Sequence, residues 1–309
     1  MRSDTVREFF LRWIGAREKE LALSTAQIYR KTAENFLNFL GERSDRPIAE
    51  LTVSDLTGFR DHEAKRTSSI SAVNRLKNIK PWVIDAWREG LLLDNIAIKI
   101  PRSKGHNKGR VKRRPFTMDE VQKLLESASP EWQGMILMGL YTGQRLGDCA
   151  RLSWSQVDLV REEISFSTEK TGRRQIIPLV GAWRKWLMDN VTDDPDGPVF
   201  AELNKLVTNA GGRTATLSNR FYDIMVAAGI AEKRTHQKKK EGRDSPREMN
   251  QVSFHCLRYT ATTMLKAAGV PEAIARDIIG HESAAVSRNY TLIDEETKRA
   301  ALAKLPERI

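Results

Sequence analysis

The chain has 309 residues, of which 40% are hydrophobic and 29% charged, a composition typical of a soluble globular protein whose length favours two domains. Its apolar runs fall short of the roughly 20 residues of a membrane span, and residues 1–8 lack the layout of a secretory signal, so we expect a cytoplasmic protein with no membrane partner. The formal net charge of +11 favours a polyanion such as nucleic acid as partner, although a solvated basic face explains charge alone equally well.

The first hundred residues predict a helical bundle. Two stripes of apolar side chains at helical spacing define its first two helices: Phe9, Phe10, Trp13 and Ile14, then Ile28, Tyr29, Phe36, Leu37, Phe39 and Leu40. Residues 24–27 have the pattern of a capping box that would start the second helix. Two more helices are predicted over residues 54–65 and 69–89, and Pro81 is expected to kink the last of them. We therefore assign residues 1–100 to an N-terminal four-helix domain.

Basic residues concentrate in two stretches outside these helices. The first, residues 101–114, carries no acid and is predicted to be an interdomain linker that follows a phosphate backbone, although a solvated tether would have the same composition. The second is a predicted loop over residues 233–247. The candidate DNA contacts in the two stretches are Lys104, Lys108, Arg110, Lys112, Arg113, Arg114, Lys238, Lys239 and Lys240.

Residues 115–309 combine helices with a short hairpin. Thr117 and Glu120 have the pattern of a second capping box. The predicted elements are a buried helix around residues 136–140, strands at 163–167 and 174–179, and helices from 181 onward, of which 217–228 and 260–268 are the clearest. Gly172 is expected in the turn between the strands. The predicted fold class is therefore mainly α with a small antiparallel β-sheet.

Three segments far apart in the chain each contain a cation or a nucleophile in a recognisable frame. They are residues 142–148 (TGQRLGD), residues 255–258 (HCLR), and Gly280-His281 followed nine residues later by Tyr290. Each segment alone has an ordinary structural explanation. Together, in this order and spacing, they resemble the catalytic signature of the tyrosine recombinases of the phage integrase type. Residues 169–172 (EKTG) fit as well, because they lie in the predicted hairpin, where that family places its catalytic lysine.

The resemblance implies a reaction and a set of catalytic residues: Arg145, Lys170, His255, Arg258, His281 and Tyr290. Tyr290 would attack a DNA phosphodiester, forming a 3′-phosphotyrosyl link and releasing a 5′-hydroxyl. His255 would accept the phenol proton, and Lys170 would protonate the departing oxygen. Because the bond energy is conserved, rejoining needs no ATP, and the chain has no Gly-x-x-x-x-Gly-Lys-Ser/Thr loop.

The need for fixed positive charge explains the two arginines. A phosphodiester in transit to a tyrosine ester gains negative charge on its equatorial oxygens. Arg145 and Arg258 are always charged and present planar forks that match two phosphate oxygens, so we expect no metal and no other cofactor. By analogy with the family, His281 would donate a hydrogen bond to a non-bridging oxygen. Asp148 stands where the family more often has Glu, and it would hold Arg145 by hydrogen bonding.

The resemblance also implies partners. The N-terminal bundle would be a core-DNA-binding domain that holds double-stranded DNA from one face, with the catalytic domain on the other. Four subunits would exchange strands between two DNA sites through a Holliday junction, in integration or excision within the nucleoid. DNA-bending or directionality proteins are candidate accessory partners. Because the first helix begins near Val6, we expect no separate arm-type DNA-binding module ahead of it.

The C-terminal tail places Ile293, Ala300, Leu302 and Leu305 at roughly helical spacing. In the family such a tail docks on a neighbouring subunit, whereas a frayed terminus is the ordinary alternative. On the first interpretation, deletion of the residues after Asp294 is expected to abolish cooperative assembly on DNA and to leave the fold intact.

Three other functions compete with the recombinase as interpretations of this sequence. A type I B topoisomerase-like enzyme would only relax supercoils, and the bundle and the tail argue against it. A non-catalytic DNA-binding regulator would have a decayed site, whereas all six catalytic residues are present. A protease using Cys256 and His255 is remote, because adjacent residues on one helix point in different directions. Cys149 and Cys256 give no disulfide framework or zinc-ligand set, and both are predicted to be buried.

Overall fold

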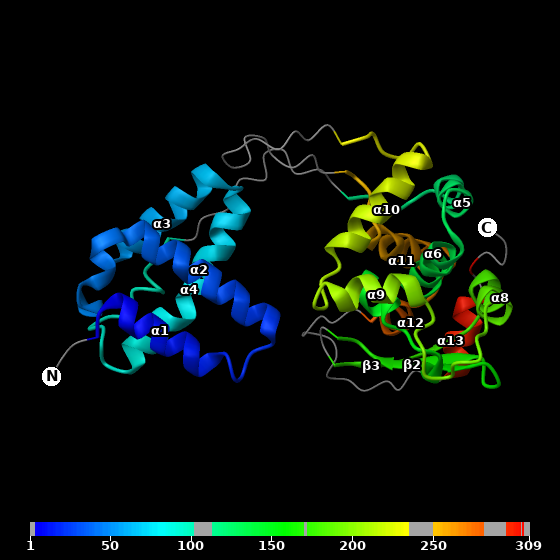
Figure 1. Cartoon of the computed structure of the whole chain (residues 1–309), viewed down its shortest axis with the longest axis horizontal. Helices are drawn as coiled ribbons and strands as arrows, with labels where there is room; N and C mark the ends of the chain where they lie inside the picture. Colours follow the sequence, from blue (N-terminus) through cyan, green and yellow to red (C-terminus); the bar gives the residue numbers. More distant parts are fainter. Residues whose placement is uncertain are drawn as a thin grey trace. The chain divides into compact units, whose positions relative to one another are not determined.

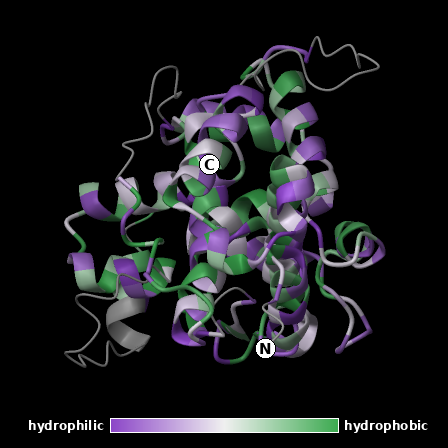
Figure 2. Ribbon diagram, turned by 90° about the vertical axis from the view of Figure 1, so that its left-hand side faces the viewer, coloured by the Kyte–Doolittle hydropathy of each residue, from purple (hydrophilic) through white to green (hydrophobic). Residues whose placement is uncertain are grey.

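The computed structural model describes residues 4–101, 113–169, 172–234, 250–280, 295–303 and 305. Within these residues the protein consists mainly of α-helices with one small antiparallel sheet, which confirms the predicted fold class (Figure 1). Its helical ribbons carry both hydrophobic and hydrophilic residues (Figure 2), as expected of helices that bury one face and expose the other. None of the described helices is both long and apolar enough to cross a membrane.

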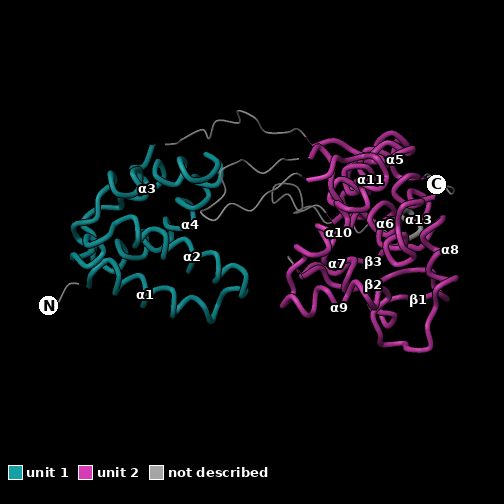
Figure 3. Tube along the Cα trace, turned by 45° about the horizontal axis from the view of Figure 1, so that its top comes forward, with its two compact units in different colours: residues 1–110 teal, residues 111–309 magenta. Residues whose placement is uncertain are grey.

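The chain divides into two compact units, residues 1–110 and residues 111–309 (Figure 3). Each unit has its own hydrophobic core, and the two cores share no residue. The division falls inside the basic stretch of residues 101–114, of which residues 102–112 lie outside the described part of the chain.

Unit 1 is a bundle of four helices, as predicted. Its elements are α1 (Val6–Arg17), α2 (Leu23–Leu40), η1 (Gly41–Asp45), η2 (Ile48–Glu50), α3 (Val53–Arg66) and α4 (Ser69–Arg88). The centre of the bundle is aromatic: the ring centroid of Phe36 lies 5.1 Å from that of Phe59 and 5.6 Å from that of Trp82, both edge to face. Such pairs add roughly 0.5–1.5 kcal/mol each beyond the area that they bury.

Two details of the predicted bundle are wrong. α2 begins at Leu23, ahead of the predicted capping box, and its N-cap residue Ala22 makes no side-chain hydrogen bond. A side-chain cap contributes only about 1 kcal/mol, and the backbone instead forms an earlier turn in which Ala26 N–H donates to Ala22 O at 3.0 Å. Ile28, which was predicted to face the core, is 54% exposed. Pro81 lies inside α4, and the kink that it is expected to cause stays a prediction.

Unit 2 combines helices with a 3-stranded antiparallel sheet of order β1-β2-β3. Its elements are α5 (Met118–Glu126), α6 (Pro130–Thr142), α7 (Leu146–Ala150), η3 (Trp154–Gln156), β1 (Val157–Asp158), β2 (Glu163–Ser167), β3 (Arg174–Pro178), α8 (Gly181–Asp189), α9 (Ala201–Asn209), α10 (Ala215–Ala227), α11 (His255–Ala267), α12 (Glu272–Ile279) and α13 (Glu295–Leu302). The predicted β2–β3 hairpin is confirmed, with Gly172 at φ 65° in its turn. The short strand β1 was not predicted.

The buried helix α6 organises unit 2. Every residue from 134 to 142 is buried, and α6 packs against α5, α7, α8 and α11. A glycine permits the close approach of α11, because a Cβ at Gly139 would lie 2.9 Å from Cδ1 of Leu257. α11 begins at His255, earlier than predicted, so His255 and Arg258 both belong to its first turn. The close packing of α6 and α11 therefore sets the position of the predicted catalytic residues on α11.

The C-terminal helix α13 packs within unit 2. It contacts β3 and α12, and Leu302 and Leu305 are buried in the core of the unit, whereas Ala300 is exposed. A frayed terminus is therefore excluded for these residues. Deletion of everything after Asp294 would expose part of this core, so the deletion is expected to reduce the stability of unit 2 as well as to affect assembly. Ile293 and Asp294 themselves lie outside the described residues.

Candidate active site

Arg258 on α11 is held by the ends of two other helices. Only 3% of the residue is exposed, and its guanidinium donates to Gly143 O at 2.6 Å and to Gly280 O at 2.9 Å. Gly143 ends α6 and Gly280 ends α12, with φ of 64° and 71° in the left-handed region. Helix C-termini carry partial negative charge, which stabilises a buried cation. The position of Arg258 thus depends on the meeting of α6, α11 and α12.

Arg145 follows two residues after Gly143 and is the N-cap residue of α7. Burial and then the neighbouring charge of Arg145 lower the pKa of Arg258 to about 10, so the two guanidiniums are close enough to repel each other. Arg258 still carries its charge at neutral pH. An anion placed against both cations would relieve this repulsion, which is the electrostatic requirement for binding a phosphodiester in transit.

Asp148 connects Arg145 to the β2–β3 hairpin. Its Oδ2 lies 3.8 Å from Nη1 of Arg145, an ion pair too long for a hydrogen bond, so the predicted hydrogen bond to that arginine is wrong. Its Oδ1 instead accepts from the backbone N–H of Glu169 at 3.0 Å. The carboxylate therefore links α7 to the hairpin turn while it balances the charge of Arg145.

His255 is the first residue of α11 and is exposed. It stands three residues before Arg258, and residues three apart on a helix share a face, so the imidazole and the guanidinium lie on the same side of α11. Its ring packs edge to face against Tyr259, with ring centroids 5.6 Å apart. The imidazole is therefore accessible to a bound substrate.

Three predicted catalytic residues lie outside the described residues: Lys170, His281 and Tyr290. The residues that precede Lys170 and His281 in the chain, Glu169 and Gly280, are described, and each is hydrogen-bonded to the site through its backbone. Sequence reasoning did not identify the carbonyls of Gly143 and Gly280 as ligands of Arg258. A glycine directly after a helix is the ordinary signal of a C-cap, but it does not say which side chain the cap carbonyl binds.

Two of the candidate DNA contacts are described, and both bind other residues of unit 2. The guanidinium of Arg114 donates two hydrogen bonds of 2.6 Å to the carboxylate of Glu120, which lowers the pKa of that carboxyl group. Arg113 donates to Ser253 Oγ at 2.6 Å. Their contact with DNA stays a prediction. The other candidates lie outside the described residues: Lys104, Lys108, Arg110, Lys112, Lys238, Lys239 and Lys240.

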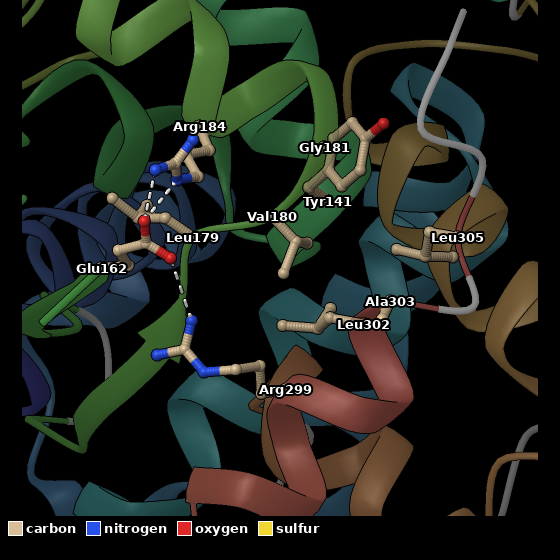
Figure 4. A pocket seen from close by; sticks show the side chains of 10 residues that line it. All are labelled: Tyr141, Glu162, Leu179, Val180, Gly181, Arg184, Arg299, Leu302, Ala303 and Leu305. Atoms are coloured by element: carbon tan, nitrogen blue, oxygen red, sulfur yellow. Dashed lines mark hydrogen bonds and ion pairs between the residues drawn. The ribbon is translucent and has the colours of Figure 1, made fainter.

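Away from Arg145 and Arg258, the described residues form a cavity but no cluster of metal ligands. Among the described residues no group of three or more His, Cys, Asp or Glu side chains is arranged to hold a metal ion. A cavity of about 260 Å³ lies beside α13 and α8 (Figure 4). At its edge Glu162 accepts from Nε of Arg184 at 2.7 Å and from Nη1 of Arg299 at 3.4 Å. This cavity belongs to the packing of α13 and not to the candidate active site.

The family model described as "Phage integrase family" matches residues 114–297, more than half of the chain. The chain belongs to the phage integrase family. Its relatives by sequence include the integrase of Escherichia phage lambda, 24% identical over 291 residues, with 90% of this chain and 74% of that protein covered. Tyrosine recombinase XerC of Roseiflexus sp. (strain RS-1) is 23% identical over 307 residues, with 97% and 92% covered. The predicted resemblance of this phage integrase family member to the tyrosine recombinases is confirmed.

Other relatives are longer than this integrase family chain, and solved structures share its fold. The chain spans 64% of the integrase of Escherichia phage HK022, which is 21% identical over 249 residues and matches 80% of this chain. A lambda integrase(75-356) dimer bound to a COC′ core site has a TM-score of 0.66 at 19% identity, covering 94% of this chain and 100% of that one. The Tn1549 transposon integrase (aa 82-397) with circular intermediate DNA has a TM-score of 0.65 at 16% identity, covering 96% and 99%.

Proposed function

We propose that the chain is a site-specific DNA recombinase that cleaves and rejoins DNA strands through a 3′-phosphotyrosine at Tyr290. The observation that carries the proposal is the pairing of Arg258 with Arg145. The hydrogen bond from Arg258 to Gly143, across 115 residues of sequence, brings the second guanidinium to the segment that carries the first, two residues before Arg145. Two adjacent cations, one of them buried with a lowered pKa, suit an oxyanion that gains charge during the reaction.

The chemistry assigns a proton to each step. A free phenol has a pKa of about 10 and must lose its proton to attack. His255, exposed on the same side of α11 as Arg258, accepts that proton as the Tyr290 oxygen bonds to phosphorus. The bond to the 5′-oxygen breaks, Lys170 protonates that oxygen, and His281 donates to a non-bridging oxygen. The reverse attack by a 5′-hydroxyl rejoins the strand without ATP, metal or other cofactor.

The assembly proposed is a homotetramer on two double-stranded DNA sites. Residues 1–100 form the core-DNA-binding domain, residues 101–114 the linker and residues 115–309 the catalytic domain, and strand exchange proceeds through a Holliday junction. Support comes from solved structures of lambda integrase, described as a dimer on a core site and as a tetramer bound to a Holliday junction. Accessory DNA-bending or directionality proteins would select between integration and excision.

The test is covalent capture of DNA. Purified protein is mixed, in EDTA and without ATP, with nicked duplexes from the DNA that flanks its own gene, and an adduct resistant to SDS is sought. Wild type is expected to form the adduct, and Tyr290→Phe is expected to form none while binding the same DNA. Exchange of strands between two duplexes then separates recombination from topoisomerase-like relaxation. Binding without any adduct on nicked duplexes would favour the non-catalytic regulator instead.

A further inference from the structure

The turn of the β2–β3 hairpin is closed by backbone hydrogen bonds. Thr168 N–H donates to Arg173 O at 2.9 Å, and Gly172 N–H donates to Thr168 O at 2.8 Å. The strands continue this pairing from Ser167 and Arg174. The contacts of the two arms, which end at Glu169 and resume at Gly172, therefore set where the chain enters and leaves the turn.

One arm of the hairpin contacts α12 through three side chains, Arg173, Gln175 and Asp277, which we call the Arg173 cluster. The guanidinium of Arg173 pairs with the carboxylate of Asp277. With the buried amide of Gln175 turned so that its oxygen faces Arg173, it accepts from Nε of Arg173 and donates to the backbone oxygen of Asp277, each at 3.1 Å. A Cβ at Gly280 would lie 3.1 Å from this amide, so the cluster lies directly against the end of α12.

The other arm contacts α7, the helix that begins after Arg145. Asp148 Oδ1 accepts from Glu169 N–H at 3.0 Å, and Arg151 pairs with the carboxylate of Glu169. The hairpin is thus held between the helix that follows Arg145 and the helix that precedes His281. Lys170 is the next residue after Glu169 in the chain.

The chemical nature of the Arg173 cluster indicates a geometric role. Arg173 and Asp277 are partly exposed, with 34% and 24% of their side chains accessible, and partly exposed ion pairs add little to stability. Hydrogen bonds between charged groups are nevertheless directional, and Gln175 connects the guanidinium of Arg173 to the backbone of Asp277. Such a cluster sets position more than it sets stability.

We propose that the Arg173 cluster positions the hairpin so that Lys170 reaches the departing 5′-oxygen. This inference rests on the proposed function, because that oxygen departs only when Tyr290 bonds to phosphorus. Arg173, Gln175 and Asp277 do not touch the reacting atoms and are positioning residues. Lys170 alone supplies the proton that the 5′-oxygen takes up as its bond to phosphorus breaks.

The experiment compares two forms of the nicked duplex that is used to seek the covalent adduct. One has the normal phosphodiester, and the other has sulfur in place of the bridging 5′-oxygen. A thiolate leaves without protonation, so the sulfur substrate does not need the general acid. Asp277→Asn and Arg173→Met are expected to slow cleavage of the oxygen substrate by roughly 100-fold, the usual effect of misplacing a reacting group by about 1 Å. With the sulfur substrate, both are expected to stay within roughly 3-fold of wild type.

Arg174→Met is the matched control, because Arg174 is the adjacent arginine on β3, is exposed and lies outside the Arg173 cluster. It is expected to change neither rate by more than roughly 3-fold. Asp277→Glu keeps the charge and is expected to restore part of the oxygen rate. Thermal unfolding is measured for each variant, and if Asp277→Asn fails to fold, Arg173→Lys and Arg173→Met make the same comparison from the other partner.

Equal slowing of the two substrates by Asp277→Asn or Arg173→Met would overturn the inference, as would normal cleavage of the oxygen substrate by both. Failure of wild type to cleave either substrate would contradict the proposed function itself, and no variant is needed to see it. The two failures are therefore distinguishable.

Discussion

At the scale of single residues, the candidate site depends on glycines as much as on charged groups. Arg258 is held by the carbonyl oxygens of Gly143 and Gly280, which both have left-handed backbone. A side chain at Gly143 would also overlap Cδ1 of Ile279. The sequence motif containing Arg145 therefore includes a glycine whose function is to place a second arginine.

Gly143→Ala is expected to destabilise unit 2 and to slow adduct formation, because its Cβ would displace Ile279 and shift the carbonyl that holds Arg258. The left-handed conformation costs an alanine about 1–2 kcal/mol, and overpacking adds roughly 1–3 kcal/mol. Gly211→Ala is the control, since Gly211 has φ 60° and a Cβ there would meet nothing within 4 Å, so only the first cost applies. Urea unfolding measures the loss of stability in each of the two variants. Equal losses in the two variants would show that the contact with Ile279 has no cost.

At the scale of elements, helix α13 is attached to its own unit through the side chain of Glu162. Glu162 lies in the turn before β2 with φ 55°, a conformation that non-glycine residues rarely adopt. Its carboxylate contacts Arg184 on α8 and Arg299 on α13 (Figure 4). The turn is thus held in an unfavourable conformation where its side chain joins two helices.

Glu162→Gln is expected to loosen α13, because the amide loses its charge attraction to both arginines. These pairs are partly exposed, so the expected effect is only about 0.5–1 kcal/mol, or a roughly 2- to 5-fold faster hydrogen exchange of α13 amides. Asp189→Asn, which removes the exposed Lys185–Asp189 pair on α8, is the control and is expected to leave α13 exchange unchanged. Unchanged exchange in Glu162→Gln would contradict a role for Glu162 in holding α13.

At the scale of the whole molecule, the chain is two cores joined by a basic stretch. The core of unit 1 comprises residues between 6 and 100, and that of unit 2 residues between 116 and 305, with no residue in common. Since hydrophobic burial dominates folding, each unit has the means to fold by itself.

The fragment of residues 1–101 is accordingly expected to fold alone. Circular dichroism should show a helical protein that unfolds cooperatively at about 45–65 °C, as small domains do. Phe36→Ala removes a fully buried ring from the aromatic centre and is expected to cost about 3–5 kcal/mol, enough to unfold the fragment or to lower its melting temperature strongly. A gradual, non-cooperative melt of the unaltered fragment would show that unit 1 needs unit 2.

The sequence by itself determined most of the longer elements and the chemical groups of the protein. The buried helix α6, the hairpin and most of the bundle follow from local spacing of apolar residues, because periodicities of 3.6 and 2 place those residues on one face. The spacing of the motifs likewise identified the family. Local patterns predicted the wrong boundary where the energy difference between two starting points of a helix is small. At the start of α2, the predicted side-chain cap, worth about 1 kcal/mol, did not form.

Only the tertiary structure decided which groups meet. The contact of Arg258 with Gly143 and the pairing of Arg173 with Asp277, across 115 and 104 residues of sequence, arise where packed helices end beside one another. Asp148 was predicted to form a hydrogen bond with Arg145; it forms only a longer ion pair with that arginine, and its hydrogen bond is to the backbone N–H of Glu169 in the hairpin. α13 likewise packs on its own unit, because β3 and α12 leave an apolar surface that it covers. Such contacts depend on how faces distant in the sequence pack together, and no short-range spacing encodes that packing.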